Sequence, residues 1–164
     1  MKQLTFLIIA IIFSTVVAFG QKSVPSVSVK SLDGESFDLQ EFASDPEVVY
    51  IVDFWATWCS PCKKELDAIA DYYEDWQEDY NVELIAITID NQRALPKVPG
   101  VVETKGWEYE ILAGNEEAMR NAFNFQTIPH TVVIKGGQVV YEHNGYVPGF
   151  EDELEEVVAK AAGQ

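Results

Sequence analysis

Cysteine and histidine are scarce in this chain. Its 164 residues include two cysteines, Cys59 and Cys62, and two histidines, His130 and His143. Two cysteines fit a working dithiol better than a disulfide-stapled scaffold. A structural zinc site usually needs four ligands, so it would have to recruit both histidines as well. A purely structural disulfide is disfavoured too, because closing a loop of two residues hardly constrains the unfolded chain.

Basic residues are also scarce. The sequence has 11 Lys and Arg against 27 Asp and Glu, a formal net charge of −16. So acidic a surface repels phosphates, and we therefore expect no nucleic-acid partner and no docking to anionic lipid. The simplest interpretation of this net charge is that it keeps the protein soluble. No internal repeat, low-complexity tract or interdomain linker is visible, and the length suits one domain with a full core.

Long hydrophobic runs are confined to the N-terminus. Lys2 is followed by an uncharged, mostly apolar run over residues 4–19, and small residues precede Gln21. This pattern predicts a signal peptide over 1–20 and a single mature domain over 21–164. A retained membrane anchor is the alternative, but the run is short for a span, which needs about 20 residues. No cysteine stands at the junction, which excludes a lipoprotein anchor.

The two cysteines are separated by two residues and follow a strongly apolar segment. Residues 48–55 are rich in β-branched and aromatic side chains and predict a buried strand. Pro61 suits the first turn of a helix, where its missing N–H costs nothing. Cys59 would then lie at the helix N-terminus, where free N–H groups and the helix dipole favour a thiolate. Such a thiolate can attack a disulfide, and Cys62, one turn further, can resolve the mixed disulfide.

Two carboxylates accompany this dithiol. Asp53 interrupts the apolar strand, and a buried carboxylate without a partner tends to hold its proton. It can then act as acid or base for the resolving thiol, unless it pairs structurally with a lysine or a water. Glu65 follows Cys62 by three residues and hence lies on the same helix face. The alternative for Glu65 is a solvated carboxylate in the first turns of the helix.

Two segments carry a resemblance to a known family. The stretch VDFWATWCSPCKKE over residues 52–65 resembles the thioredoxin active site, and its last four residues resemble the TlpA/ResA-like branch of exported bacterial thioredoxins. Downstream, Thr-Ile-Pro at 127–129, followed by a strand at 131–134, resembles the cis-proline segment of the family. The resemblance covers residues 24–160, and two motifs in the correct order make a chance match improbable.

The resemblance implies roles for residues of both segments. Asp53 matches the buried aspartate of thioredoxins, and Glu65 matches the active-site glutamate of ResA-like proteins. In the family the cis-proline lies opposite the dithiol, and the backbone before it receives an extended peptide. Without the resemblance, Pro129 would read as an ordinary strand-initiating proline. We expect substrates to contact Trp58, Ser60, Pro61, Ile128, Pro129, Gly145 and Tyr146.

Two further side chains near these motifs are interpreted more plainly. His130 departs from the threonine common at this place in the family. It either caps the strand or tunes the thiols near neutral pH, and we favour the first. Trp55 is expected to pack in the core rather than to contact substrate.

The order of elements predicts an α/β thioredoxin fold, with a mixed central β-sheet flanked by helices. We expect an N-terminal β-hairpin across Asp33-Gly34 and an insertion at about 91–115, both of which resemble the TlpA/ResA-like elaboration. The remaining expected elements are a helix over 61–80, a strand over 82–89, a broken helix or loop over 91–106, a helix over 116–123, a hairpin of strands 131–134 and 139–143, and a helix over 151–161.

The sequence thus predicts an exported thiol–disulfide oxidoreductase of the periplasm or cell envelope, reducing protein disulfides. Its expected redox group is the Cys59–Cys62 disulfide, with no other cofactor. Expected partners are protein thiols and disulfides and a membrane-linked thiol electron donor, with membrane contact only through a retained signal segment. The alternative is a thioredoxin-fold copper chaperone using Cys59, Cys62 and a histidine, although those proteins space their cysteines one residue further apart. A peroxiredoxin is disfavoured because no Thr-x-x-Cys pattern occurs.

Overall fold

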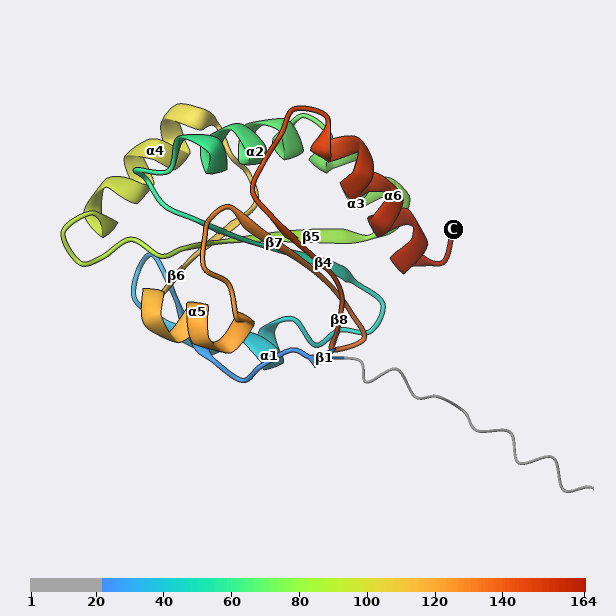
Figure 1. The fold of residues 1–164 in the computed structure, drawn as a ribbon, viewed down its shortest axis with the longest axis horizontal. Coiled ribbons are helices and arrows are strands. Elements are labelled where there is room, and N and C mark those ends of the chain that lie inside the picture. The colour runs from blue at the N-terminus through green and yellow to red at the C-terminus, as the bar shows by residue number, and fades with distance from the viewer. Residues whose placement is uncertain (1–21) are drawn as a thin grey trace, which may run out of the picture.

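A mixed eight-stranded sheet forms the centre of the protein (Figure 1). The structure, a computed structural model, describes residues 22–164, so the predicted signal peptide lies outside the described residues. The elements, in chain order, are β1 (Lys22–Ser23), β2 (Ser28–Ser31), β3 (Ser36–Asp38), α1 (Leu39–Phe42), β4 (Val49–Trp55), α2 (Ser60–Ala70), α3 (Tyr73–Tyr80), β5 (Val82–Thr88), a 3₁₀ turn (Leu95–Lys97), α4 (Val98–Lys105), β6 (Glu110–Gly114), α5 (Glu116–Phe123), β7 (His130–Lys135), β8 (Gln138–Asn144) and α6 (Phe150–Ala162).

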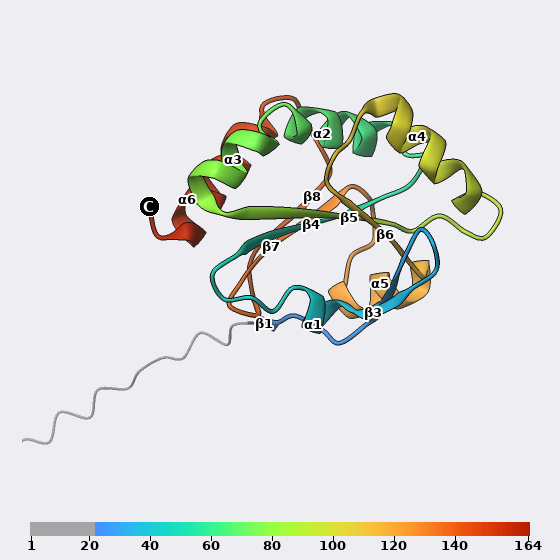
Figure 2. The same ribbon diagram turned by 180° about the vertical axis from the view of Figure 1, so that it is seen from behind.

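Helices cover both faces of the sheet. The strand order is β1-β8-β7-β4-β5-β6-β2-β3, with β4, β5 and β6 parallel and the other neighbours antiparallel. Figures 1 and 2 show α2, α3, α4 and α6 on one side of the sheet and α1 and α5 on the other. This arrangement confirms the predicted thioredoxin fold, and the β2–β3 hairpin confirms the predicted N-terminal elaboration.

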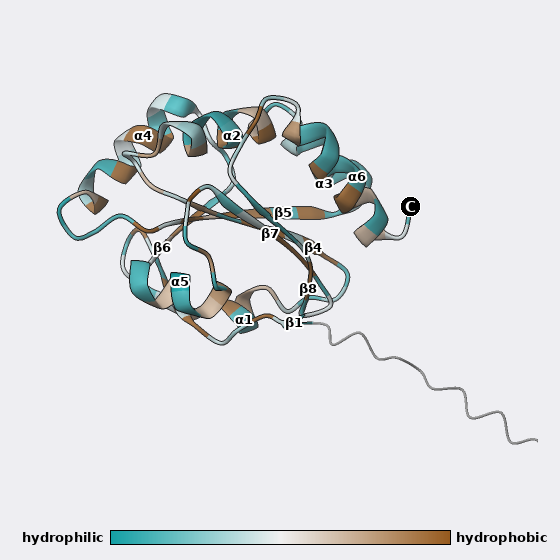
Figure 3. Ribbon diagram, viewed as in Figure 1, coloured by the Kyte–Doolittle hydropathy of each residue, from teal (hydrophilic) through white to brown (hydrophobic). Residues whose placement is uncertain are grey.

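The central strand β4 is buried along its whole length. All seven of its residues are shielded, because a strand between two helical layers has no solvent-facing side. Hydrophobic residues follow the central strands in Figure 3, whereas the helices carry hydrophilic residues on their outer sides. Trp55 is fully buried and packs edge-on against Trp107, as expected of a core residue. Because side chains alternate along β4, Asp53 and Phe54 face opposite helical layers.

The predicted helix over 61–80 is wrong in one respect, because it is two helices. A tight turn at Asp71 and Tyr72 separates α2 from α3, and the Tyr72 N–H donates to the Ile69 carbonyl at 3.1 Å. Both turn residues keep right-handed helical dihedral angles. The break therefore uses no proline or glycine and leaves the apolar spacing intact, so the sequence carried no signal for it.

The region 91–115 contains more regular structure than predicted. Pro96 lies in the first turn of the 3₁₀ segment and Pro99 in that of α4, so the prolines begin these segments rather than interrupt one. The short strand β6 follows and was missed. It pairs with β5 on one side and β2 on the other, and so joins the N-terminal hairpin to the sheet.

The last strands and α6 complete the sheet and its cover. The β7–β8 hairpin turns at Gly136 and Gly137, both with positive φ, the conformation that its two-residue turn requires. Helices α5 and α6 lie within one residue of their predicted limits. In the part of the chain that the structure describes, no helix has the length and apolar character needed to cross a bilayer.

Candidate active site

The two cysteines form a disulfide at the start of α2. Cys59 is the N-cap residue, and its Sγ accepts a hydrogen bond from the Cys62 N–H at 3.3 Å. The exposed fraction is 5% for Cys59 and 0% for Cys62, so the first sulfur is the accessible one. Pro61 occupies the first turn, as predicted. In the reduced protein, the N–H groups of this turn would stabilise a thiolate on Cys59.

The loop before Cys59 is fixed by Asp90. The backbone N–H and the hydroxyl of Thr57 donate to the two carboxylate oxygens of Asp90 at 2.8 and 3.0 Å. The Thr88 hydroxyl also donates to Asp90, at 2.8 Å. The Lys63 ammonium donates to the Thr57 carbonyl at 2.8 Å. The sequence analysis missed Asp90. Its signal was a carboxylate placed directly after a buried parallel strand, on the edge where the dithiol also lies.

The predicted cis-proline segment lies against the dithiol. The Ile128–Pro129 peptide bond is cis, and the Ile128 carbonyl oxygen lies 3.9 Å from Cys59 Sγ. The Gly145 N–H donates to the Pro129 carbonyl at 2.9 Å, with Gly145 at φ 83°, a conformation that favours glycine. Three segments distant in sequence therefore meet at Cys59, as the resemblance implied.

Apolar side chains surround this meeting point. Trp58 is 60% exposed, Ser60 and Pro61 are exposed, Ile128 and Tyr146 are half-buried, and Pro129 is buried. Val147, which the sequence analysis did not single out, is 65% exposed beside Tyr146. The exposed Trp and Val side chains, which flank Cys59 and Tyr146 in the sequence, suit contact with an apolar or extended polypeptide segment.

Two buried carboxyls share one hydroxyl beneath the dithiol helix. Asp53 on β4 and Glu65 on α2 are both fully buried, so the solvated alternative for Glu65 is wrong. The Thr131 Oγ1 lies 3.2 Å from Asp53 Oδ2 and 2.5 Å from Glu65 Oε1. Thr131 was missed, because its place opposite Asp53 depends on the β4–β7 register, which no local pattern reveals.

Burial sets the proton affinity of this carboxyl pair. Desolvation, reinforced by the charge of Glu65, raises the pKa of Asp53 well above its usual 3.8. Desolvation likewise raises the pKa of Glu65, to about 7. Among residues 22–164, neither carboxyl forms a hydrogen bond or ion pair with a lysine or arginine, and the hydrogen bond from Thr131 only partly offsets the desolvation. The lysine partner considered for Asp53 is therefore not what the structure shows.

His130 lies on the other face of the sheet. It is paired with Phe54 across the strands and stacks on Phe54 and Phe125, whereas its neighbour Thr131 faces Asp53. Its Nδ1 lies 3.0 Å from Asn144 Oδ1, and burial lowers the pKa of the ring. Within the described range, no three His, Cys, Asp or Glu side chains are grouped as metal ligands. The placement of His130 gives the copper-chaperone alternative no support.

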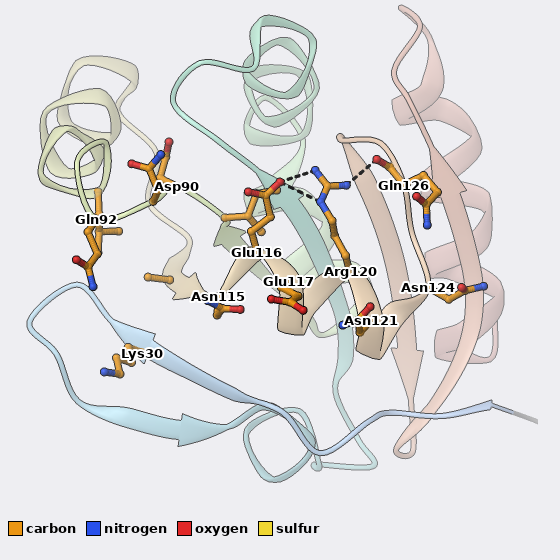
Figure 4. Close-up of a pocket in the computed structure, with 15 residues that line it drawn as sticks. Lys30, Asp90, Gln92, Asn115, Glu116, Glu117, Arg120, Asn121, Asn124 and Gln126 are labelled. Atoms are coloured by element: carbon orange, nitrogen blue, oxygen red, sulfur yellow. Dashed lines mark hydrogen bonds and ion pairs between the residues drawn. The ribbon is translucent and has the colours of Figure 1, made fainter.

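A polar cavity of about 770 Å³ adjoins the loop that Asp90 fixes. Figure 4 shows Lys30, Asp90 and Gln92 on one side, with Arg120 on α5 bonded to Glu116 and to the Gln126 carbonyl. Six amide side chains line it, and neither cysteine does. Thiol chemistry therefore belongs to the surface opposite Pro129 rather than to this cavity.

Fold and site together define a class of protein. An accessible cysteine at a helix start, a buried one a turn later and a cis-proline beside them place the chain among the thioredoxin-like thiol–disulfide oxidoreductases.

Comparison with known proteins supports this assignment to the thioredoxin-like thiol–disulfide oxidoreductases. Residues 21–143 match the AhpC/TSA family model, and the chain belongs to this family. The thiol-disulfide oxidoreductase ResA of Halalkalibacterium halodurans is 28% identical over 77% of this chain and 68% of that protein. An uncharacterized thioredoxin-like protein of Porphyromonas gingivalis, solved in solution, is 34% identical, with a TM-score of 0.75 over 87% of this chain and 94% of that one. A thiol:disulfide interchange protein of Chlorobium tepidum is 27% identical, with a TM-score of 0.68 over 87% and 97% of the two chains.

Proposed function

We propose that this protein is an exported reductase of protein disulfides that works through Cys59 and Cys62. The observation that carries the proposal is the pairing of an accessible Cys59 sulfur with the Ile128 carbonyl, 3.9 Å away, above a fully buried Cys62. Such a site admits one sulfur of a client disulfide to Cys59 and keeps Cys62 for the second step.

The reaction proceeds in two exchanges. The Cys59 thiolate attacks a client sulfur, a Cys59–client bond forms, and the other client sulfur leaves with the electron pair of the broken bond. The Cys62 thiolate then attacks Cys59 Sγ, which forms the Cys59–Cys62 disulfide and releases the second client thiol. Two electrons pass to the client, and an external dithiol must return the protein to its reduced state.

Asp53 and Glu65 serve the second exchange. Cys62 is fully buried, and burial disfavours a thiolate, so its proton needs an acceptor within the fold. Both carboxyls lie on the side of the sheet that α2 covers, and Glu65 follows Cys62 by one helical turn. The ionised form of a carboxyl accepts the proton, and Glu65, with its pKa raised to about 7, suits this role because a base works best when its pKa lies close to the operating pH.

Clients bind as extended segments over the apolar rim of the site. The backbone of Ile128, next to Pro129, offers hydrogen bonds to an added strand, and Gly145 holds the neighbouring loop in place. Trp58, Ser60, Pro61 and Tyr146 supply contacts around the sulfur. No additional cofactor takes part in this scheme.

Export rests on the sequence rather than on the fold. The charged and apolar pattern of residues 1–20 is that of a signal peptide, which would deliver the domain to the periplasm or cell envelope. A membrane-linked thiol protein is the electron donor that such a compartment requires.

Trapping tests the assignment of the two cysteines. Cys62→Ser should accumulate mixed disulfides with clients, because the first exchange occurs and the second cannot. Cys59→Ser should accumulate none. Trapping by Cys59→Ser alone would reverse the assignment, and trapping by neither would remove the proposed function.

The direction of electron flow is tested by equilibrating the Cys59–Cys62 couple in a redox buffer. A reduction potential of about −270 mV is expected for a reductase, whereas a potential of about −120 mV would make the protein an oxidant.

A further inference from the structure

The hydroxyl of Thr131 stands between two carboxyls that water does not reach. Its Oγ1 lies 2.5 Å from Glu65 Oε1 and 3.2 Å from Asp53 Oδ2, and all three residues are fully buried. The other oxygens, Asp53 Oδ1 and Glu65 Oε2, have no hydrogen-bond partner among residues 22–164. The hydroxyl thus bridges the two carboxyls, which also lie close enough together for each to act as a hydrogen-bond partner that shifts the pKa of the other.

This geometry limits the number of protons that the carboxyl pair can hold. A hydroxyl carries one hydrogen, so Thr131 can donate to only one of its two neighbours. If both carboxyls were ionised, the second contact would press two lone-pair oxygens together in a site without water, which is costly. The second contact becomes favourable when that carboxyl carries a proton and donates to Oγ1. The arrangement therefore suits a pair that holds one proton and one negative charge.

Two proton arrangements satisfy the same three oxygens. In one, Glu65 donates to Thr131 and Thr131 donates to Asp53. In the other, Asp53 donates to Thr131 and Thr131 donates to Glu65. Exchange between them moves two hydrogens along existing hydrogen bonds and transfers the charge from one carboxyl to the other.

The surrounding groups favour a single charge over two. Titratable groups face the pair from α2, from the segment before β6, from β8, from the loop after β8 and from the first turn of α6. They are Cys62, Tyr109, Tyr141, His143, Tyr146 and Glu151. Of these, His143, which is cross-strand from Thr131, is the one that can become a cation. The acidic Glu151 opposes a second negative charge on Glu65.

We propose that Thr131 is a positioning residue that relays a proton between Asp53 and Glu65 while Cys62 is deprotonated. The role rests on the proposed dithiol mechanism. In the mixed disulfide, the S–H bond of Cys62 breaks and its proton passes to the ionised carboxyl. The resulting thiolate forms the bond to Cys59 Sγ, and the client thiolate leaves with the electron pair and takes a proton from solvent. The carboxyl pair, now holding two protons, returns one to solvent through the relay.

The position of the pair gives the relay a direction. Asp53 lies on the central strand, whereas Glu65 lies on α2, where its charge affects Tyr146 in the loop beside the active site. A proton moved through Thr131 therefore passes between the central strand and α2, the helix that begins at the dithiol.

Titration of the oxidised protein tests the shared proton without any client. Carboxyl ¹³C NMR of labelled Asp and Glu should show two separated apparent pKa values for the pair in the wild type and in Thr131→Ser, which keeps the hydroxyl. Thr131→Val keeps the shape and removes the bridge, so the ratio of the two acid constants should fall by about tenfold or more. An unchanged ratio in Thr131→Val would overturn the proposal, as would an equal loss in Thr131→Ser.

Stopped-flow kinetics tests the relay itself. Thr131→Val should slow resolution of the mixed disulfide on the order of tenfold and alter its pH profile, with the first attack by Cys59 unchanged and Thr131→Ser near wild type. If Thr131→Val does not fold, the solvent isotope dependence of the wild type decides. Resolution rates in H₂O/D₂O mixtures should curve, as two moving protons require, and a straight line would overturn the relay.

The two proposals fail in distinguishable ways. If Cys62→Ser traps no client, the proposed function falls, while the carboxyl titration still decides whether Thr131 holds a shared proton. If trapping succeeds and Thr131→Val resembles the wild type in titration and in resolution, the function stands and the relay falls.

Discussion

Replacement of Asp53 should change the reaction rate and the folding stability in opposite directions. It is fully buried, and its pKa is raised by desolvation and by the charge of Glu65. Asp53→Asn removes a costly buried charge, so the free energy of unfolding at pH 8 should rise by about 1–2 kcal/mol. The same change removes the proposed proton acceptor, so resolution of the mixed disulfide should slow by roughly tenfold or more, with the first attack nearly unchanged.

Stopped-flow tryptophan fluorescence, with Trp58 beside the dithiol as reporter, measures both exchanges, and thermal melting measures the stability. If Asp53→Asn leaves the resolution rate and the thermal midpoint untouched, Asp53 is an ordinary satisfied core residue and the acceptor role is lost.

The carboxyl pair also sets the pH dependence of folding. The pKa of each carboxyl is higher in the folded protein than its ordinary value of 3.8 for Asp53 or 4.5 for Glu65, with that of Glu65 at about 7. Their stabilising contribution is therefore complete below those ordinary values and is lost as the pH rises through the pKa values of the folded state, which for Glu65 is about 7. We expect the oxidised protein to lose on the order of 2 kcal/mol from this pair between pH 5 and pH 8.

Thermal melts of the wild type and of Asp53→Asn/Glu65→Gln across that range test this. The double variant should lose less stability with rising pH, and Glu103→Gln, which replaces an exposed glutamate of α4, should match the wild type. Parallel curves for wild type and double variant would show that the pair titrates alike in folded and unfolded chains.

Single residues differed in how far the sequence revealed them. Cys59, Cys62 and Pro61 were predictable because their chemistry depends on local spacing at a helix start. Asp53 stood out as a charge within an apolar strand. Thr131 and Asp90 act through partners that are distant in sequence, at separations of 78 and 33 residues, so only the folded sheet shows their roles.

At the scale of elements, the strand ends hold the active-site loop. Asp90, just after β5, accepts hydrogen bonds from Thr57 and Thr88. Asp90→Ala leaves these donors without their partner, so stability should fall by about 2 kcal/mol. The loop before Cys59 should loosen, and attack by Cys59 should slow severalfold, while the carboxyl pair titrates as before.

Urea unfolding and the rate of the first exchange measure these effects. A variant that unfolds at the wild-type urea midpoint, or that attacks client disulfides at the wild-type rate, would show that the loop holds its shape without Asp90.

The limits of most elements were also predictable, and the exceptions have physical causes. Buried strands and α5 follow clear periodicity, so their ranges were found within one or two residues. Strand β6 was missed because it is short and lies in the expected insertion at 91–115, beyond the broken helix or loop predicted over 91–106. The α2–α3 break was missed because its turn keeps helical dihedral angles and an unbroken apolar face.

At the scale of the whole molecule, the placement of both histidines argues against a metal carrier. His130 stacks on Phe54 and Phe125 on the sheet face away from Asp53, and His143 stacks on Phe150. We expect the purified, reduced protein to hold no stoichiometric zinc or copper. Elemental analysis that finds one metal per chain, lost on His130→Ala, would favour the copper-chaperone alternative instead.

The alternation of side chains in β4 and β7 separates two kinds of mutational tolerance. Asp53 and Thr131 face each other on one side of the sheet, and the next pair, Phe54 and His130, faces the aromatic layer on the other. Adjacent residues of each strand are therefore under different constraints, one on chemistry and one on packing. We expect changes at Asp53 and Thr131 to alter the proposed proton movement, and changes at Phe54 and His130 to alter packing while the thiols keep their chemistry. An engineer who wishes to retune the enzyme or to stabilise it can thus work on two adjacent cross-strand pairs of the same two strands.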